Sequence, residues 1–171
     1  IILIYNDVRR FGFFKLYKNI NEISFLNKLG LEPLSKNFNY VYFKKNIRNK
    51  KKNIKNLLMD QSFVSGLGNI YVNEVLHIAK INPLKVSNKL KNIEIKKIIS
   101  AIKVILRVAI LNGGSSIRDF ENTLGKKGNF QQLFKVYGRE NKKCSRISCK
   151  GKIKRILISN RSSFFCDLCQ K

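Results

Sequence analysis

All four cysteines lie in the last 28 residues, as Cys144-x4-Cys149 and Cys166-x2-Cys169. Each close pair can supply two thiolates, and the sixteen residues between the pairs are enough to fold back and bring them together. We therefore expect one structural Zn²⁺ held by four thiolates, with no position open for catalysis. Disulfide pairing is the alternative, but short paired spacing without a visible signal peptide favours zinc.

The segment between the cysteine pairs is expected to form a hairpin. Residues 152–158 and 162–165 predict two short strands around the turn Ser159-Asn160-Arg161. A tip held by metal can enter a nucleic-acid groove, so Arg161 is a candidate phosphate ligand. The alternative is a solvated turn arginine.

A second constellation is the turn Gly66-Leu67-Gly68 between two predicted helices. Glycine lets a phosphate approach closely, and the free N–H groups and dipole of the next helix point at the same spot. We expect that helix over residues 70–80, with Asn69 as its N-cap and a candidate hydrogen-bond donor to phosphate. A simple packing corner is the alternative.

Other candidates carry weaker signals. Residues 5–12 place Phe11 beside Arg9 at a predicted turn, where an aromatic can enter a base stack and an arginine can read a base edge. His77 lies within a predicted helix and is expected to be a packed or surface residue, not a ligand. The ten carboxylates contain no pair with recognisable acid/base spacing.

The charge balance points to a polyanionic partner. Lys and Arg number 35 against 10 Asp and Glu, a formal net charge of +25, to which a coding bias toward Asn, Lys and Ile contributes. Nucleic acid is favoured over membrane, because the longest apolar stretch, residues 93–111, is interrupted by four basic residues. Hydrophobic residues make up 44%, enough for a core.

Hydrophobic patterning predicts a mainly helical chain. Residues 1–5 and 13–17 read as two strands of a sheet whose other strands are missing. Helices are expected over residues 21–29 (ended by Gly30), 38–48, 53–63, 70–80 and, capped by Asn92, a long core helix up to Gly113. We divide the chain into residues 1–18, 19–135 and 136–171.

Four segments together resemble formamidopyrimidine-DNA glycosylase, over its C-terminal two-thirds. They are Met59-Asp-Gln-Ser-Phe-Val-Ser-Gly-Leu-Gly-Asn-Ile-Tyr, Asn82-Pro83, Val136-Tyr-Gly-Arg139 and the four cysteines. The resemblance implies a mainly α fold: a helix-two-turn-helix DNA-binding domain, a β-hairpin zinc finger, and before them a remnant of an N-terminal β-sandwich. The first cysteine pair is longer than the Cys-x2-Cys of many members, which we expect only to enlarge one turn.

The resemblance also implies an activity, that of a bifunctional glycosylase and AP lyase acting in base-excision repair of oxidised purines. The lesion is flipped out of double-stranded damaged DNA, and an N-terminal proline amine attacks the sugar. That proline, its neighbouring Glu and the catalytic Lys would lie upstream of Ile1, and the chain begins Ile-Ile-Leu-Ile, so we expect these 171 residues alone to be inactive. A non-catalytic nucleic-acid-binding zinc module and an endonuclease VIII-like glycosylase for oxidised pyrimidines are the alternatives.

By position, the resemblance implies a role for each candidate residue. Arg9 and Phe11 would fill the void left by the lesion, Glu74 would face its pocket, and residues 123–130 would cap the flipped base. Arg161 would bind phosphate and donate a proton in δ-elimination. The remaining DNA-backbone ligands would be Lys50, Lys51, Lys55, Asn69 and Tyr137. We expect a monomer, in a bacterial cytoplasm with the nucleoid or in an organelle.

Overall fold

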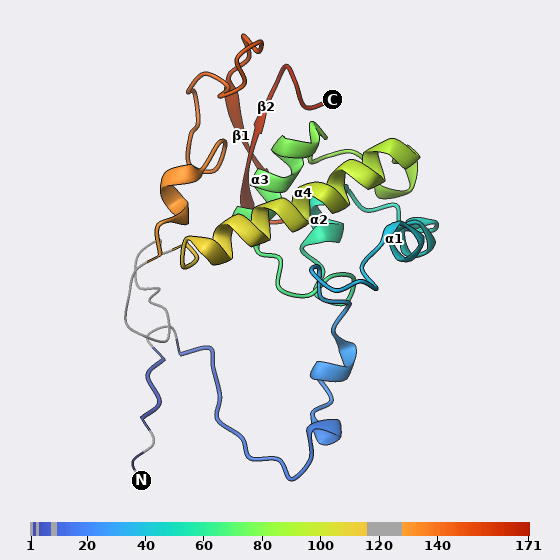
Figure 1. The fold of residues 1–171 in the computed structure, drawn as a ribbon, viewed down its shortest axis with the longest axis vertical. Helices are drawn as coiled ribbons and strands as arrows, with labels where there is room; N and C mark the ends of the chain where they lie inside the picture. Colours follow the sequence, from blue (N-terminus) through green and yellow to red (C-terminus); the bar gives the residue numbers. More distant parts are fainter. Residues whose placement is uncertain (1, 3, 8–9, 116–127) are drawn as a thin grey trace.

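The computed structural model describes residues 2, 4–7, 10–115 and 128–171, and it is mostly helical with one antiparallel hairpin (Figure 1). The helices are α1 (Tyr40–Ile47), α2 (Ile54–Leu58), α3 (Asn69–Ala79) and α4 (Asn92–Leu111). Short 3₁₀ turns occupy Ile20–Glu22, Leu26–Lys28, Ser87–Lys89 and Phe130–Leu133. The strands are β1 (Ile153–Ile158) and β2 (Arg161–Cys166).

The amphipathic α4 organises the core, as its spacing predicts. Ile95, Ile98, Ile102 and Ile105 are buried against α1 and α3, because residues three and four apart share one helix face. The helix begins one residue from the expected cap. Lys91 is the N-cap, and its N–H donates to the Glu94 carboxylate at 2.8 Å.

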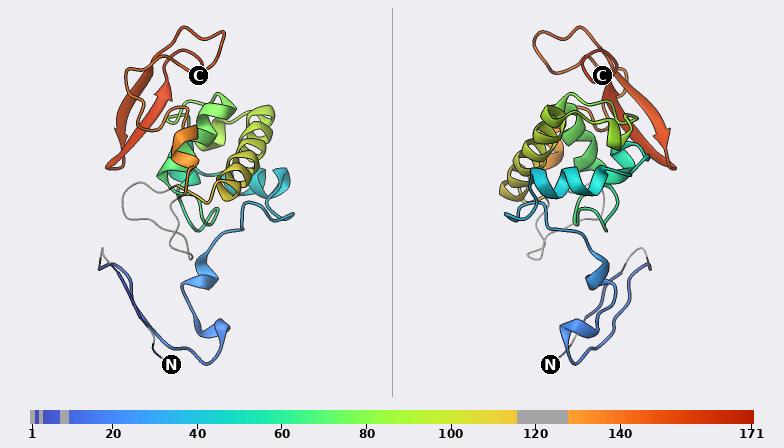
Figure 2. Two further views of the ribbon diagram at one scale, coloured as in Figure 1. Left: turned by 60° about the vertical axis from the view of Figure 1, so that its left-hand side comes forward. Right: turned by 90° about the vertical axis from the view of Figure 1, so that its right-hand side faces the viewer.

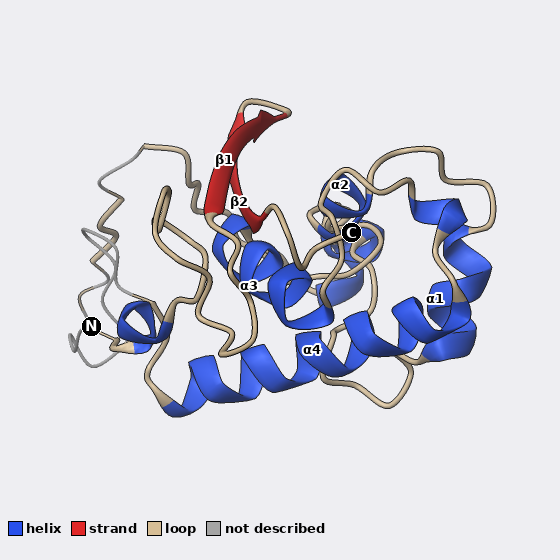
Figure 3. Cartoon of the chain, turned by 90° about the horizontal axis from the view of Figure 1, so that it is seen from above, coloured by secondary structure: helices blue, strands red, loops and turns tan. Residues whose placement is uncertain are grey.

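Helix α3 lies between α4 and the hairpin. Viewed from above, the hairpin rises on one side of α3 and α4 runs along the other (Figure 3). A second, smaller core contains Val136, Ile153 and Phe164, together with the buried Cys144 and Cys166. Figure 2 shows β1 and β2 standing at the edge of the helical body, with the described N-terminal segment, drawn in dark blue, extending away from it. Helix α3 therefore contacts both the helical core, through α4, and the hairpin, through β2.

The predicted helix over residues 53–63 is wrong in length, because α2 ends at Leu58. The Asp60 carboxylate accepts hydrogen bonds from the N–H of Ser62, at 3.1 Å, and from its hydroxyl, at 2.6 Å. Such side-chain bonds offer the backbone an alternative to the helix. Hydrogen bonds from Lys52 and Ser62 lower the pKa of Asp60 to about 2, so the carboxylate is charged at neutral pH.

The N-terminal expectations have mixed outcomes. Residues 21–29 form two 3₁₀ turns in place of one helix. Gly30 does not cap them in a left-handed conformation; it is needed because an added Cβ would lie 2.4 Å from the carbonyl carbon of Phe63. The described residues among 1–18 form no strand, so the sandwich remnant and the three-part division stay predictions.

Candidate functional site

The four cysteines come together as their spacing predicts. All four are free, and their sulfur atoms lie within 4.8 Å of one another. Sγ of Cys144 is 3.9 Å from that of Cys169, and Sγ of Cys149 is 3.6 Å from that of Cys166. A tetrahedral ion with Zn–S bonds of about 2.3 Å separates its sulfurs by about 3.8 Å. The residues therefore fit a four-thiolate metal site.

Burial and the neighbouring sulfurs raise the pKa of the Cys169 thiol to about 12. A cation bound here has to displace that proton, so metal binding is expected to release protons. Sequence reasoning overlooked Gly151 beside this cluster. A Cβ at Gly151 would lie 2.7 Å from Sγ of Cys166, which explains why glycine stands there.

The hairpin turn is shorter than predicted. Ser159 and Asn160 both have positive φ, 48° and 58°, and Ile158 pairs directly with Arg161. This is a two-residue turn whose twist suits the strands, so Arg161 is the first residue of β2. Asn56 of α2 donates from Nδ2 to Ser159 Oγ at 2.9 Å and holds the turn against the helical body.

Three predicted ligands meet at the start of β2. Asn69 Nδ2 donates to the Ser162 carbonyl at 3.0 Å, and Lys55 Nζ donates to the same oxygen at 3.2 Å. Lys55 Nζ also donates to Ser163 Oγ at 2.5 Å. Arg161, next along the chain, is exposed. Residues more than 90 positions apart are thus brought to one place.

Lys55 is the least expected member of this cluster, because its side chain is fully buried. Burial, with a contribution from the positive charge of Arg161, lowers the pKa of Lys55 from 10.5 to about 8. Desolvation disfavours the ammonium form, and a like charge adds to the effect. A negative group arriving here would relieve both penalties.

The double-glycine turn borders the cluster. Gly66 has φ of +80°, and neither Gly66 nor Gly68 has any atom within 4 Å of the place a Cβ would take. Gln61 holds the turn: its Nε2 donates to the Leu67 carbonyl at 3.0 Å, and its Oε1 accepts from Gly66 N–H at 2.8 Å. The N-cap of α3 is Gly68, not Asn69 as expected, which leaves the Asn69 amide for the hairpin.

Glu74 is placed differently from what the resemblance implies. Its side chain is 1% exposed, and its carboxylate accepts the N–H groups of Lys135, Val136 and Tyr137 at 2.9–3.0 Å. We call residues 144–169 the cysteine hairpin. Glu74 anchors the backbone of residues 135–137, which leads into this hairpin, and does not face an open pocket. The Tyr137 ring packs edge-on against Phe164, with centroids 5.1 Å apart.

The other predicted ligands are not brought to this cluster by any described contact. Lys50 and Lys51 are exposed. Phe11 is 89% exposed. Arg9 lies outside the described residues, as do residues 123–127 of the expected capping loop.

Asn73 was missed from sequence, whereas His77 is packed in the interior, one of the two placements expected for it. Asn73 Oδ1 accepts from the Phe164 N–H at 2.6 Å, and buried His77 places Nε2 3.6 Å from Cys144 Sγ. Burial, with the charges of Arg146 and Lys135, lowers the pKa of His77 to about 4, so the ring is neutral. The four-residue spacing of Asn69, Asn73 and His77 puts them on one face of a helix, a signal that was available in the sequence.

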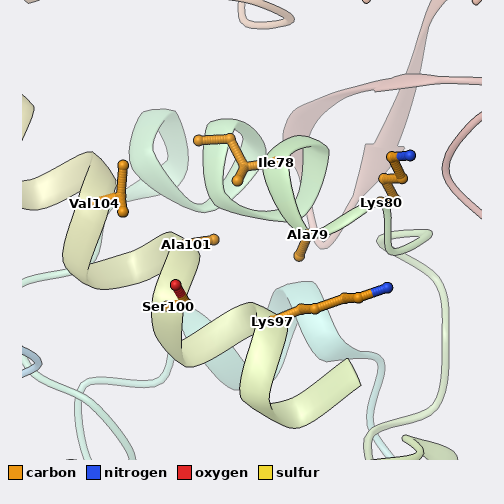
Figure 4. Close-up of a pocket in the computed structure, with 7 residues that line it drawn as sticks. All are labelled: Ile78, Ala79, Lys80, Lys97, Ser100, Ala101 and Val104. Atoms are coloured by element: carbon orange, nitrogen blue, oxygen red, sulfur yellow. The ribbon is translucent and has the colours of Figure 1, made fainter. Parts of the chain in front are cut away.

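A separate groove of about 350 Å³ lies between α3 and α4 (Figure 4). Ala79, Ala101 and Val104 line it, with Lys80 and Lys97 at one end. Its lining contains the Ser100 hydroxyl but no carboxylate, thiol or imidazole that could act as a general base beside it.

Among the described helices, none is long and apolar enough to cross a membrane.

Together, fold and site define a helix-two-turn-helix protein with a four-cysteine hairpin. Residues 29–121 match the family model described as the formamidopyrimidine-DNA glycosylase H2TH domain. The chain is 45% identical over 170 residues to the formamidopyrimidine-DNA glycosylase of Rickettsia bellii, covering 99% of this chain and 62% of that protein. It thus spans about three fifths of the length of that relative. The chain belongs to the formamidopyrimidine-DNA glycosylase family.

Solved structures agree with this assignment. The Fpg protein of Thermus thermophilus superposes with a TM-score of 0.81 at 33% identity, over 90% of this chain and 57% of that one. Lactococcus lactis Fpg, in a complex with DNA containing an abasic site, gives 0.78 at 42% identity, over 86% and 54%.

Proposed function

We propose that the chain is the DNA-binding part of a glycosylase and AP lyase that removes oxidised purines from duplex DNA. The supporting observation is the convergence of Lys55, Asn69 and Arg161 beside the open double-glycine turn. This cluster carries two cations and no carboxylate. A phosphate group of the DNA backbone suits this cluster better than a neutral ligand does.

The proposed contacts use several kinds of donor. Lys55 and Arg161 supply charge, Asn69 supplies an amide, and the first N–H groups of α3 have no acceptor within the helix. The open surface at Gly66 and Gly68 lets a phosphate approach the backbone. Lys50, Lys51 and Tyr137 are proposed as further backbone ligands, and Arg9 and Phe11 as residues that fill the space left by the flipped lesion.

We propose that Cys144, Cys149, Cys166 and Cys169 hold one structural Zn²⁺. When bound, the ion supplies a crosslink between the two cysteine pairs and no open coordination position. What the chain gains is a fixed hairpin, which keeps Arg161 at the phosphate cluster. In the full reaction we propose that Arg161 also donates a proton during δ-elimination.

The proposed nucleophile of the family is a proline with a free amine. The chain contains only Pro33 and Pro83, and the nitrogen of each lies inside a peptide bond. We propose that these 171 residues bind damaged duplex DNA without forming a Schiff base. Borohydride treatment with abasic-site DNA should therefore trap no covalent complex, and a trapped complex would contradict this part of the proposal.

Binding is tested by fluorescence anisotropy with a duplex that carries a tetrahydrofuran abasic analogue. About four phosphate contacts predict a slope of log K against log salt of about −3 to −4. Arg161→Ala should weaken binding by about tenfold or more and reduce the slope by about 0.9. Lys97→Ala, on α4 at one end of the groove between α3 and α4 (Figure 4), is the matched control. Equal losses in both variants would reduce Arg161 to a general contributor of charge.

A further inference from the structure

Helix α3 contacts the cysteine hairpin along its length through one polar face. Asn69 reaches Ser162 near the turn, Asn73 reaches Phe164 in the middle of β2, and His77 reaches Cys144 at the metal end. These three side chains are four residues apart and therefore point the same way. The third contact has no part in the proposed phosphate site.

His77 is buried beside the metal cluster without belonging to it. Its side chain is 2% exposed, and Nε2 lies 3.6 Å from Cys144 Sγ. His77 is not among the four residues whose ligand atoms gather within 4.8 Å. Nδ1 has no partner within the described part of the chain. A neutral ring with its proton on Nε2 can donate to the sulfur and leave only an acceptor unpaired.

Arg146 makes a second link at the same place. It lies within the first cysteine pair, in the four residues between Cys144 and Cys149. Its guanidinium donates to the carbonyls of His77, at 2.6 Å, and Ile78, at 3.1 Å. These carbonyls belong to the last turn of α3, where a cation is favoured. The long turn thus does more than add length.

We propose that His77 and Arg146 are positioning residues that fasten the first cysteine pair to the end of α3, with His77 donating Nε2–H to the metal-bound thiolate of Cys144. The proposal rests on the proposed zinc site. Donors that orient metal ligands commonly change metal affinity by 10–100-fold when they are lost. His77→Phe keeps a flat ring without a donor, so it should release zinc about 10–100-fold faster to a chromogenic chelator.

Matched variants separate the hydrogen bond from packing. His77→Gln keeps an N–H donor of similar reach and should remain within a few-fold of the parent. Arg146→Met should also speed release, whereas Ile147→Ala, in the same turn with its side chain fully exposed, should not. In cobalt-substituted protein, the sulfur-to-metal charge-transfer band should move to lower energy in His77→Phe and stay in place in Ile147→Ala.

A measurement on the unmodified chain covers the case in which His77→Phe does not fold. Cadmium-113 substitution with proton–nitrogen correlation of the imidazole should show the Nε2–H tautomer, with scalar coupling from that proton to cadmium. An Nδ1–H tautomer, or parent-like zinc release in His77→Phe, would overturn the proposal while leaving the zinc site intact. Failure of the unmodified chain to bind zinc would overturn both.

Discussion

Replacing Lys55 by Met should change stability and DNA affinity in opposite directions. Lys55 is fully buried, and its pKa falls from 10.5 to about 8, first because of burial and then because of Arg161. At about 1.4 kcal/mol per pH unit, folding disfavours the charged form by about 3 kcal/mol at neutral pH. Met fills similar space without that charge.

Lost hydrogen bonds offset part of the stabilisation that comes from removing the buried charge. Lys55→Met removes a donor from the Ser162 carbonyl and from Ser163 Oγ, which costs about 1–2 kcal/mol. Asn69 still donates to Ser162, and the Ser163 hydroxyl still donates to the Arg161 carbonyl at 3.2 Å, so neither group is left alone. We expect a net stabilisation of about 1 kcal/mol at pH 7, measured by urea unfolding.

The lowered pKa of Lys55 also predicts how the stability difference between Lys55→Met and the parent changes with pH. Between pH 8 and 10.5 the unfolded chain holds more protons at Lys55 than the folded chain does, so the parent gains stability as pH rises through this window. The advantage of Lys55→Met should therefore be complete below pH 8, fall to zero near about pH 9, and be reversed by pH 10.5, where only the cost of the lost hydrogen bonds remains. A constant difference across this range would show that the lowered pKa of Lys55 is not its source.

The same substitution should weaken DNA binding. Because Lys55 is buried, it acts on a bound phosphate as a nearby positive charge, and loss of that charge predicts a higher Kd at low salt and a slope smaller by at most about 0.9. Anisotropy titrations at several salt concentrations measure both, with Lys97→Met as the matched control. A variant that is less stable at pH 7 and binds DNA as the parent does would refute the reasoning, since Lys55 would then be a structural residue.

Three other perturbations test the surrounding structure. Glu74→Gln should lower stability by about 2 kcal/mol in urea unfolding, because an amide NH₂ would face backbone N–H donors; a neutral result would mean that the three bonds are dispensable. Gly30→Ala should cost about 2 kcal/mol or more, since its Cβ would meet the Phe63 backbone, whereas Gly68→Ala meets no atom and should cost less. Zinc chelation should remove the strand contribution to the circular dichroism and lower DNA affinity; an unchanged spectrum with unchanged affinity would contradict a structural metal.

The features that sequence predicted well are those encoded by local spacing. The two cysteine pairs lie close enough in the chain to predict that the four thiols gather in one cluster before any fold is known. The apolar positions of α4 repeat with the helical period, and the residues predicted to face the core are buried except Leu106, which is partly buried. In both cases the interacting residues, or the periodic ones, are near neighbours along the chain.

The features that sequence could not predict depend on partners far along the chain. Asn69 was expected to cap its helix, but its amide bonds Ser162, and nothing local distinguishes these two uses. Glu74 was expected to face a ligand pocket, but it holds backbone at residues 135–137. Gly30 was expected to end a helix. Glycine is needed there because of its close approach to the Phe63 backbone, a tertiary contact that the local sequence does not reveal.

The position of Arg161 depends on two anchorages that share one helix. Near the turn, Lys55 and Asn69 hold Ser162, and at the other end the cysteines gather beside His77. Asn69 and His77 are eight residues apart on α3, about 12 Å along a rigid helix. A two-stranded hairpin is not stable by itself in water, so contacts at one end alone leave the other free to fray. We therefore expect Arg161 to be held by α2 and α3 together near the turn and by α3 at the cysteine end, which makes α3 the helix that would link the proposed metal site to DNA binding.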